Sequence, residues 1–354
     1  MRIFRTAGLL AILVFVLAFP NVFTNPEITS IAVLTLLYMI AATSWNIFSG
    51  YTGYIALGHA VFFGVGSYAL ALMCKAWGVP GGYMPFLLLP IAGLFAAAFA
   101  IPIGWIALRT RRHTFIVITI AIFFVVQLMA FNLRGITNGS AGIELPIPTK
   151  WGGGFYNLPF YYVAVAMLLI ALGLSWWIRN SKYGLGLLAI RDDEDRALGL
   201  GVKTGLSKLI AFVVSAFFVG MVGALHAYFV GSIFPAFVFD PLFDVAISLM
   251  CFLGGLGTLA GPILGALILE PTQQYFTLQF SQNGYYLIIY GLLFLVIILL
   301  LPEGILPTLG HYLLKWRASR NGSQASVMKL ESGTEEEMVA MLAADKRKKE
   351  GVKS

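Results

Sequence analysis

Charged side chains that could take part in chemistry are concentrated in residues 184–206, whose sequence is GLGLLAIRDDEDRALGLGVKTGL. An active site of the Ser/His/Asp or paired-carboxylate type needs further groups at defined positions, and this pattern does not contain them. Lys203 is followed by Thr204, but a phosphate-binding GxxxxGK[ST] loop needs a glycine where this chain has Val202. The sequence therefore predicts that the chain is not an enzyme.

The sequence also contains no residue pattern typical of a metal or cofactor site. Cys74 and Cys251 lie in or beside apolar segments without CxxC spacing, which argues against a disulfide or metal framework. The four histidines are scattered along the sequence, so no zinc cluster is predicted. They are His59, His113, His226 and His311. We expect no cofactor in this chain.

Residues 189–198 predict a short amphipathic helix. Four apolar residues can share one flank of it, while the acids and arginines occupy the other flank. The four are Ala189, Ile190, Ala197 and Leu198. Gly199 and Gly201 would end the helix, because glycine tolerates the left-handed cap conformation. Such a helix between membrane spans would be a contact for a soluble partner; an ordinary polar loop is the alternative.

The composition predicts an all-α polytopic membrane protein. Hydrophobic residues make up 59% of the chain and charged residues 11%, against about 25% charged in soluble domains. Apolar runs of about 18 residues or more, enough to cross a hydrocarbon layer about 30 Å thick, recur along the sequence. The net charge of +7 is no sign of nucleic-acid binding, because the basic residues gather between the spans and near the ends.

The apolar segments predict roughly eight to ten transmembrane helices, including one broken or re-entrant segment. They are residues 7–23, 29–48, 55–74, 83–108, 114–131, 158–178, 209–234, 242–269 and 285–301. Residues 1–310 would form the transmembrane domain, and the polar residues 311–354 a cytoplasmic tail. The first segment resembles a signal peptide but lacks a small-x-small cleavage site, which favours an uncleaved helix.

Basic residues predict the orientation, since they favour cytoplasmic loops. They cluster at residues 109–112, 179–203 and 315–320, so that both termini would be cytoplasmic and residues 134–157 external. An even number of crossings must then separate Leu209 from Leu301. The sequence GGLGTLAGP at residues 254–262 can supply the extra crossing by breaking its segment into two helical pieces inside the bundle, near a pathway. A single bent span is the alternative.

A second glycine-rich stretch, residues 50–68, predicts close helix packing. His59 would lie near the cytoplasmic edge, lining a pathway or bonding a neighbouring carbonyl, and we favour the structural role, as for His226. Asp240 and Asp244 are expected to cap a helix start. No predicted span carries a charged residue near its middle, as an ion-coupled carrier would require. The chain would therefore form a route across the membrane that is driven by another molecule.

Three motifs make the chain resemble the permease subunits of branched-chain amino-acid ABC importers, specifically the longer of the two paired permeases. They are SGYTGYIALGHAVFFGVGSY at residues 49–68, the stretch 184–225, and LGGLGTLAGPILGA at residues 253–266. The resemblance implies transport of hydrophobic amino acids across a prokaryotic plasma membrane. It also implies cytoplasmic ATPase subunits that bind the ATP, a second permease in a heterodimer, and an extracytoplasmic solute-binding protein.

The resemblance further implies roles for residues of these motifs. An ATPase-coupling helix, at about residues 184–206, would present Arg191, Asp192, Glu194, Arg196 and Gly199. The translocation path or its hinge would include Gly58, His59, Gly64, Gly254, Gly255, Gly257 and Thr258. Urea or short amides are the alternative substrates, since related permeases carry near-identical motifs. An ion-coupled secondary carrier and a membrane scaffold without transport are the further alternatives.

Overall fold

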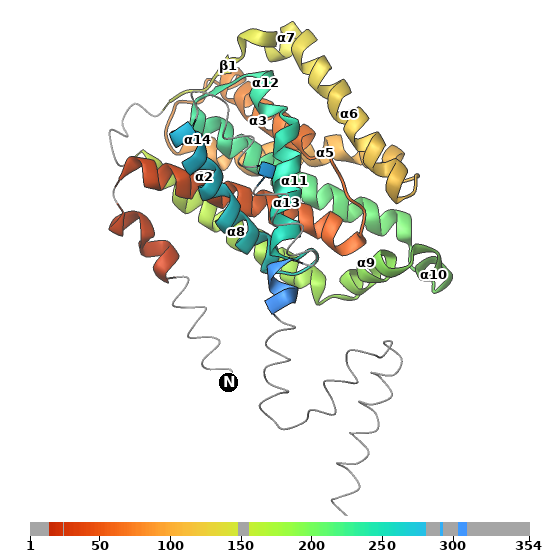
Figure 1. The fold of residues 1–354 in the computed structure, drawn as a ribbon. Helices are drawn as coiled ribbons and strands as arrows, with labels where there is room; N and C mark the ends of the chain where they lie inside the picture. The colour runs from red at the N-terminus through yellow and green to blue at the C-terminus, as the bar shows by residue number, and fades with distance from the viewer. Residues whose placement is uncertain (1–13, 24, 148–155, 281–290, 293–303, 310–354) are drawn as a thin grey trace, which may run out of the picture. The chain divides into compact units, whose positions relative to one another are not determined.

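The structure is a computed structural model that describes residues 14–23, 25–147, 156–280, 291–292 and 304–309 (Figure 1). The chain divides into two compact units, Met1–Gly304 and Ile305–Ser354. Residues 305–309 of the second unit form one helical turn. The predicted span at 285–301 and the predicted tail at 311–354 lie outside the described residues, apart from residues 291–292.

The first unit is built almost entirely from helices, in agreement with the predicted all-α fold. After helical residues 14–22 come α2 (Pro26–Trp45), η1 (Asn46–Gly50), α3 (Ala60–Ala76), α4 (Met84–Leu87), α5 (Leu89–Ala107), α6 (Arg112–Asn132), α7 (Arg134–Thr137), η2 (Gly139–Ala141), β1 (Ile143–Glu144), α8 (Asn157–Arg179), α9 (Lys182–Asp192), α10 (Glu194–Gly199), α11 (Thr204–Val230), β2 (Ser232–Ile233), α12 (Pro235–Val238), α13 (Pro241–Gly254) and α14 (Gly261–Phe280). The strands β1 and β2 form one short antiparallel ladder.

Within the described residues, six helical segments are long and apolar enough to cross a membrane. They are Pro26–Gly50, Met84–Ala107, Arg112–Asn132, Asn157–Arg179, Thr204–Val230 and Pro235–Gly254. Their helical hydrogen bonds pair the backbone groups within each segment, as a spanning segment requires in the absence of water. The protein is therefore a multi-pass membrane protein.

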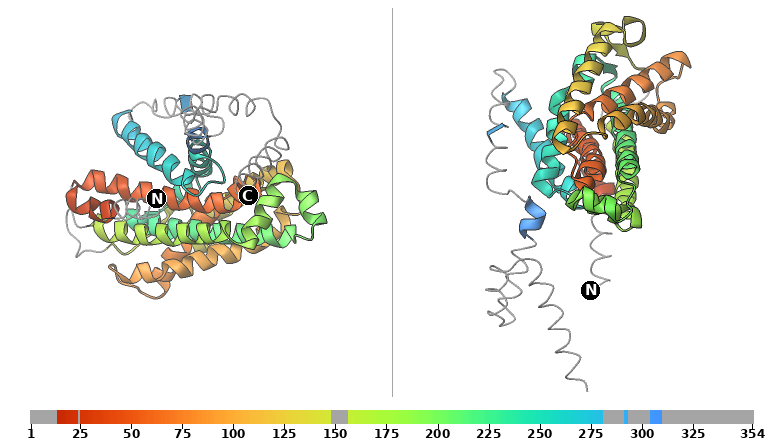
Figure 2. Two further views of the ribbon diagram at one scale, coloured as in Figure 1. Left: turned by 90° about the horizontal axis from the view of Figure 1, so that it is seen from below. Right: turned by 90° about the vertical axis from the view of Figure 1, so that its right-hand side faces the viewer.

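Helix α11 is the centre of the unit and packs against α3, α5 and α2 (Figure 1). Small residues allow these contacts: a Cβ on Gly66 would lie 2.0 Å from the carbonyl oxygen of Gly220, and one on Gly223 the same distance from that of Phe63. Close backbone approach at small residues is how helices associate in lipid. Helices α2 and α8 lie side by side at the edge of this core (Figure 2).

Helix α3 starts at Ala60, five residues later than the predicted span at 55–74. Residues 53–58 run back into the bundle without helical structure, and the buried carboxylate of Asp244 accepts hydrogen bonds from the backbone N–H groups of His59 (2.8 Å) and Ala60 (3.1 Å). Asp240 caps α13 by accepting from the N–H of Leu242, as predicted. Asp244 instead stabilises the start of a different helix, which hydropathy alone could not show.

The predicted break in residues 242–269 is confirmed, because α13 ends at Gly254 and α14 begins at Gly261. Its place near a pathway remains a prediction. The turn at residues 255–260 lies at the end of the unit that carries α9, whose Arg191 it contacts. Helix α14 also continues to Phe280 and, with 20 residues, is about 30 Å long.

Helix α14 extends beyond the predicted segment 242–269. Its centre contains Glu270, which is fully buried. Glu270 and the polar residues after it lower the local hydropathy, and for that reason the predicted segment stopped at Leu269. Hydrogen bonding along the helix continues through such residues, so hydropathy misplaced the helix end.

The predicted single helix at residues 189–198 is also wrong, because the structure has two helices there. Asp193 separates them with an extended backbone (φ −152°, ψ 110°), and its side chain accepts a hydrogen bond from the N–H of Arg196 at 3.0 Å. Aspartate is a favoured N-cap because it satisfies an N–H that lacks a helical partner. The predicted apolar flank is only partly buried: Ile190 and Ala197 are buried, but Leu198 is 59% exposed.

Candidate functional site

Three segments that are far apart in the sequence meet at one end of the unit. They are the helix pair α9–α10, the residues 50–54 that follow η1, and the turn 255–260 between α13 and α14. These are parts of the three motifs singled out in the sequence. The structure brings them together through hydrogen bonds, ion pairs and glycine contacts, which define the candidate site.

Arg191 connects α9 to the other two segments. Its guanidinium donates a hydrogen bond to the carbonyl oxygen of Gly50 at 3.0 Å. The same guanidinium lies against Gly257, where a Cβ would be 2.2 Å from Arg191 Nη1. Gly257 has φ +76°, a conformation that favours glycine. Arg191 therefore occupies space that only a glycine at position 257 leaves free.

The turn is held by two further side chains. Asn46 in η1 accepts a hydrogen bond from the N–H of Gly257 at 2.8 Å and donates one to the carbonyl of Thr258 at 2.9 Å. Arg179, at the end of α8, donates to the carbonyl of Gly257 at 2.7 Å. Because a buried peptide group without a partner is unfavourable, these bonds fix the turn relative to η1 and α8.

The turn also has internal order that depends on its sequence. The hydroxyl of Thr258 donates to the carbonyl of Gly255 at 2.7 Å and accepts from the N–H of Gly261 at 3.0 Å, which starts α14. A Cβ on Gly254 would lie 1.7 Å from the carbonyl oxygen of Gly261. The glycines at the predicted hinge are thus required for tight packing between the two helix ends.

A charged cluster fixes α10. Lys208 of α11, which is 3% exposed, donates to Glu194 Oε1 at 2.5 Å, and the hydroxyl of Tyr54 donates to the other oxygen of that carboxylate. Burial raises the pKa of Glu194, but the hydrogen bonds from Lys208 and Tyr54 and the nearby positive charges lower it by more, so the pKa lies below its ordinary value. Glu194 is therefore ionised near neutral pH.

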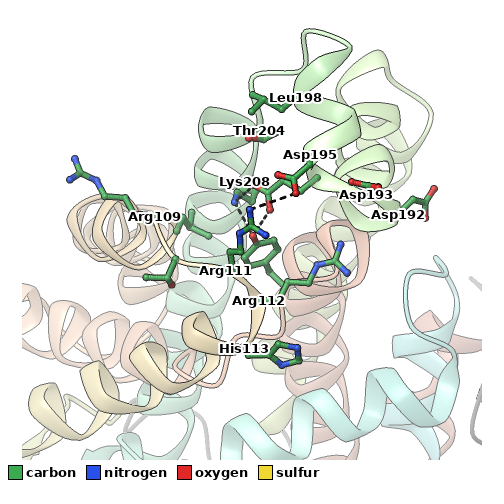
Figure 3. Close-up of a pocket in the computed structure, with 14 residues that line it drawn as sticks. Arg109, Arg111, Arg112, His113, Asp192, Asp193, Asp195, Leu198, Thr204 and Lys208 are labelled. Atoms are coloured by element: carbon green, nitrogen blue, oxygen red, sulfur yellow. Dashed lines mark hydrogen bonds and ion pairs between the residues drawn. The ribbon is translucent and has the colours of Figure 1, made fainter.

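A pocket of about 480 Å³ opens beside this cluster (Figure 3). One wall is formed by Arg109, Arg111, Arg112 and His113 at the start of α6, and the other by the acidic residues 192–195. Arg112 donates to the carbonyls of Ile190 (2.9 Å) and Arg191 (2.6 Å), at the end of α9. The Arg111–Asp195 pair, at 3.6 Å, has both side chains exposed and contributes little to stability.

The proposed coupling residues divide into two groups. Arg191 and Glu194 point into the protein and are bonded within the chain, as described above. Asp192, Arg196 and Gly199 are exposed, and Arg196 is paired only with its neighbour Asp193, at 2.9 Å. Leu200 beside them is 85% exposed.

Gly58, His59 and Gly64 lie away from the turn, inside the bundle. His59 Nε2 is 2.8 Å from Ser215 Oγ, and Ser215 is 11 residues into α11, about 16 Å along it. His59 is therefore distant from the end that carries α9, and its predicted place near the cytoplasmic edge remains a prediction. Gly58 packs on the backbone of Thr119 and Gly64 on the ring of Phe239. These contacts give the three residues packing roles in this conformation.

Sequence reasoning missed the residues that make the connections. They are Asn46, Tyr54, Arg112, Arg179 and Lys208. Lys208 carried a usable signal, since a lysine within the first turns of an apolar helix needs a buried partner. Asn46, which is fully buried, carried a similar one at the end of an apolar segment. The partners themselves come from distant segments and could not be assigned from the sequence.

Comparisons with known proteins identify the family of the chain. The family described as branched-chain amino acid transport system / permease component matches residues 27–298. The chain is 31% identical to the high-affinity branched-chain amino acid transport system permease protein LivM of Escherichia coli K12, over 90% of this chain and 78% of that protein. It is 30% identical to LivM of Salmonella typhimurium over the same shares, and 25% identical to LivH of E. coli K12 over 76% of this chain and 91% of LivH. No solved structure matches the chain.

A multi-pass helical bundle with a charged helix pair at one end defines the protein as a membrane transport component. The chain belongs to the family of permease components of branched-chain amino acid transport systems, as the resemblance of its motifs implied.

Proposed function

We propose that this chain is a permease subunit of an ATP-binding-cassette importer for branched-chain amino acids. The relatives carry this substrate class in their names, and they include both a LivM-type and a LivH-type permease. The chain would pair with a second permease, receive substrate from an extracytoplasmic binding protein, and be driven by two cytoplasmic ATPase subunits.

We also infer that the end of the unit with α9 and α10 faces the cytoplasm. Arg109, Arg111, Arg112, Arg179 and Lys182 belong to this end, and basic residues favour the cytoplasmic side. Helix α6 starts there and leads to α7 at the other end (Figure 1), which would be external. Both termini would be cytoplasmic.

The observation that supports coupling is the continuous set of bonds from α9 to the turn. An ATPase that grips the exposed residues of α10 would move α9 with it, since the two helices are joined at Asp193. Arg191 bonds to Gly50 and contacts Gly257, so the motion would reach η1 and the turn directly. Helices α13 and α14 would then change position relative to α2, which opens or closes the route for substrate.

A reconstituted importer tests this proposal. Leu200→Asp places a charge on the exposed surface at the end of α10, and we expect loss of ATPase binding and at least a tenfold fall in substrate-stimulated ATP hydrolysis. Ile136→Asp changes a residue that is 55% exposed in α7, at the opposite end, and should leave ATPase binding unchanged. Equal ATPase binding in the two variants would contradict the assignment of α10 as the docking surface.

The substrate is tested in the same vesicles. Leucine, isoleucine and valine should be taken up with ATP and the binding protein present, and urea and short amides should not compete. Uptake of an amide in preference to leucine would contradict the proposed substrate without contradicting the proposed ATPase docking. Uptake that persists without ATP and disappears with the ion gradient would identify a secondary carrier instead.

A further inference from the structure

Glu270 lies at the centre of α14 and has no role in the site described above. Its side chain is fully buried. Oε1 accepts a hydrogen bond from Gln274 Nε2 at 2.8 Å, whereas Oε2 is buried without a hydrogen-bond partner. Glu270 is nine residues after Gly261, about 14 Å along the helix from the turn. A buried carboxylate with a free acceptor oxygen is unfavourable and calls for an explanation.

A second buried acceptor lies beside it. The side-chain oxygen of Gln273 is also buried without a partner. Residues three and four apart share one helix face, which places Gln273 and Gln274 next to Glu270. Pro271 adds to this, because it has no N–H to donate to the carbonyl of Leu267, four residues earlier. The centre of α14 is therefore rich in acceptors, and one of them is an acid.

Asp244 shows what a purely structural acid looks like in this protein. It is also buried, but both of its oxygens accept hydrogen bonds from the backbone at the start of α3, at 2.8 to 3.2 Å. Its charge and its acceptors are thus used within the chain. At Glu270 only one carboxylate oxygen accepts a hydrogen bond. The other oxygen, like the side-chain oxygen of Gln273, has no hydrogen-bond donor.

The missing partner must donate hydrogen bonds and be compatible with a negative charge. A primary ammonium group has three N–H donors, no acceptor and a positive charge, and every α-amino acid in its zwitterionic form carries one. We propose that Glu270 and Gln273 receive the ammonium group of the transported amino acid halfway along α14. This proposal rests on the proposed function, and it adds a binding site within the permease to the recognition made by the binding protein.

The connection to the turn explains how the site would open. Glu270 is enclosed in this conformation, and α14 is joined to α13 by the turn that Arg191, Arg179 and Asn46 hold. A displacement of the turn would move α14 as a unit against α2 and α13, its packing partners. Access to Glu270 would then change with the state of the ATPase subunits, as alternating access requires.

The test uses the complete importer in vesicles and compares two conservative variants. Glu270→Gln retains the size and the hydrogen-bonding oxygen but removes the charge, and we expect leucine uptake to fall at least tenfold. Glu270→Asp retains the charge, and we expect it to keep more uptake than Glu270→Gln. Thr272→Val is the matched control, because the Thr272 hydroxyl bonds only to the backbone of its own helix, and it should transport normally.

Thermal unfolding separates binding from a structural role. Removing a buried, half-paired charge should raise or preserve the unfolding temperature of Glu270→Gln, so that its loss of uptake is not a loss of fold. Leucine should raise the unfolding temperature of the wild-type complex without binding protein, and this shift should be absent in Glu270→Gln. Normal uptake and an unchanged leucine shift in Glu270→Gln would overturn the proposal. A wild-type complex that fails to transport leucine would instead contradict the proposed function.

Discussion

Glu194 illustrates how single residues at the coupling end are fixed by their partners. It joins α10 to α11 through Lys208 and to the segment after η1 through Tyr54. Both partners donate to the carboxylate, and Lys208 also lies 4.3 Å from the centre of the Tyr54 ring. A residue first considered as a contact for an ATPase thus also holds the docking element to the membrane helices.

We predict that Glu194→Gln destabilises the protein by about 1–2 kcal/mol, because the buried ammonium of Lys208 loses its carboxylate. The pKa of Glu194 is below its ordinary value of 4.5. The difference from wild type should therefore be complete above that value and disappear as the pH falls through the lowered pKa of the folded state. Thermal unfolding of both proteins in detergent, from neutral pH down to about pH 2, measures this.

The control for this prediction is Asp195→Asn. Its carboxylate is paired with Arg111 at 3.6 Å, and both side chains are exposed. An exposed pair contributes little, so this variant should unfold like the wild type at every pH. A stability difference in Glu194→Gln that did not change with pH would show that shape, and not charge, carries the effect.

Gly257 gives a second prediction at the residue scale. Gly257→Ala introduces a Cβ at φ +76°, 2.2 Å from Arg191 Nη1. We expect a loss of about 1–2 kcal/mol from the backbone conformation alone, displacement of Arg191, and reduced coupling of ATP hydrolysis to transport. Gly205→Ala, in α11, meets no atom within 4 Å and should be neutral or slightly stabilising. Assays of ATP hydrolysis, uptake and unfolding would compare the two variants.

At the scale of elements, the separation of α9 from α10 is the feature that hydropathy missed. Asp193 is the C-cap of α9 and the N-cap of α10. Because the helix is interrupted there, α10 can pack against α11 in a direction different from that of α9. The sequence contained the signal in part, because aspartate is a favoured N-cap residue. Asp192 before it and Asp195 after it made the position of the cap ambiguous before the structure was known.

We predict that Asp193→Ala favours one continuous helix and misplaces α10. The lost N-cap should reduce stability by about 1 kcal/mol, whereas substrate-stimulated ATP hydrolysis should fall by a larger factor. Asp193→Asn keeps a capping oxygen and should behave like the wild type. Equal losses in the alanine and asparagine variants would indicate that the charge of Asp193 matters instead of the helix boundary.

The membrane helices themselves were largely predictable. The expected spans 114–131 and 158–178 differ by only one or two residues from α6 and α8 at each end, because apolar length decides the position of a lipid-facing helix. The errors occur where protein surrounds the backbone. Residues 53–58 are largely apolar yet not helical, and Glu270 is polar yet inside a helix, since hydropathy does not record which neighbours supply hydrogen bonds.

The candidate site was predictable in its parts but not in its assembly. The sequence motifs contained Arg191, Gly257 and Thr258, each recognisable from charge or from glycine content. Their meeting depends on Asn46 and Arg179, whose hydrogen-bond partners lie in distant segments. Contacts of this kind join segments more than 75 residues apart, and a single sequence gives no measure of such distances.

At the scale of the whole molecule, the proposed orientation predicts which surfaces face each side of the membrane. Cys74 and Cys251 are buried, so the wild type should react slowly with a membrane-impermeant thiol reagent. In intact cells, the new thiol of Leu200→Cys should not react with this reagent until the membrane is permeabilised. The thiol of Ile136→Cys should react without permeabilisation. The reverse pattern would place α9 and α10 outside and exclude cytoplasmic ATPase subunits as their partners.

The joint between α9 and the turn is made to main-chain oxygens: Arg191 bonds to that of Gly50, and Arg179 to that of Gly257. Among the described residues, neither guanidinium forms an ion pair with an acidic side chain. When either arginine is replaced, no acidic partner is therefore available whose charge could be reversed to restore the contact. Genetic suppressors of Arg191 or Arg179 variants should arise in the ATPase subunits or at neighbouring guanidinium groups, and not among the glycines that accept their hydrogen bonds.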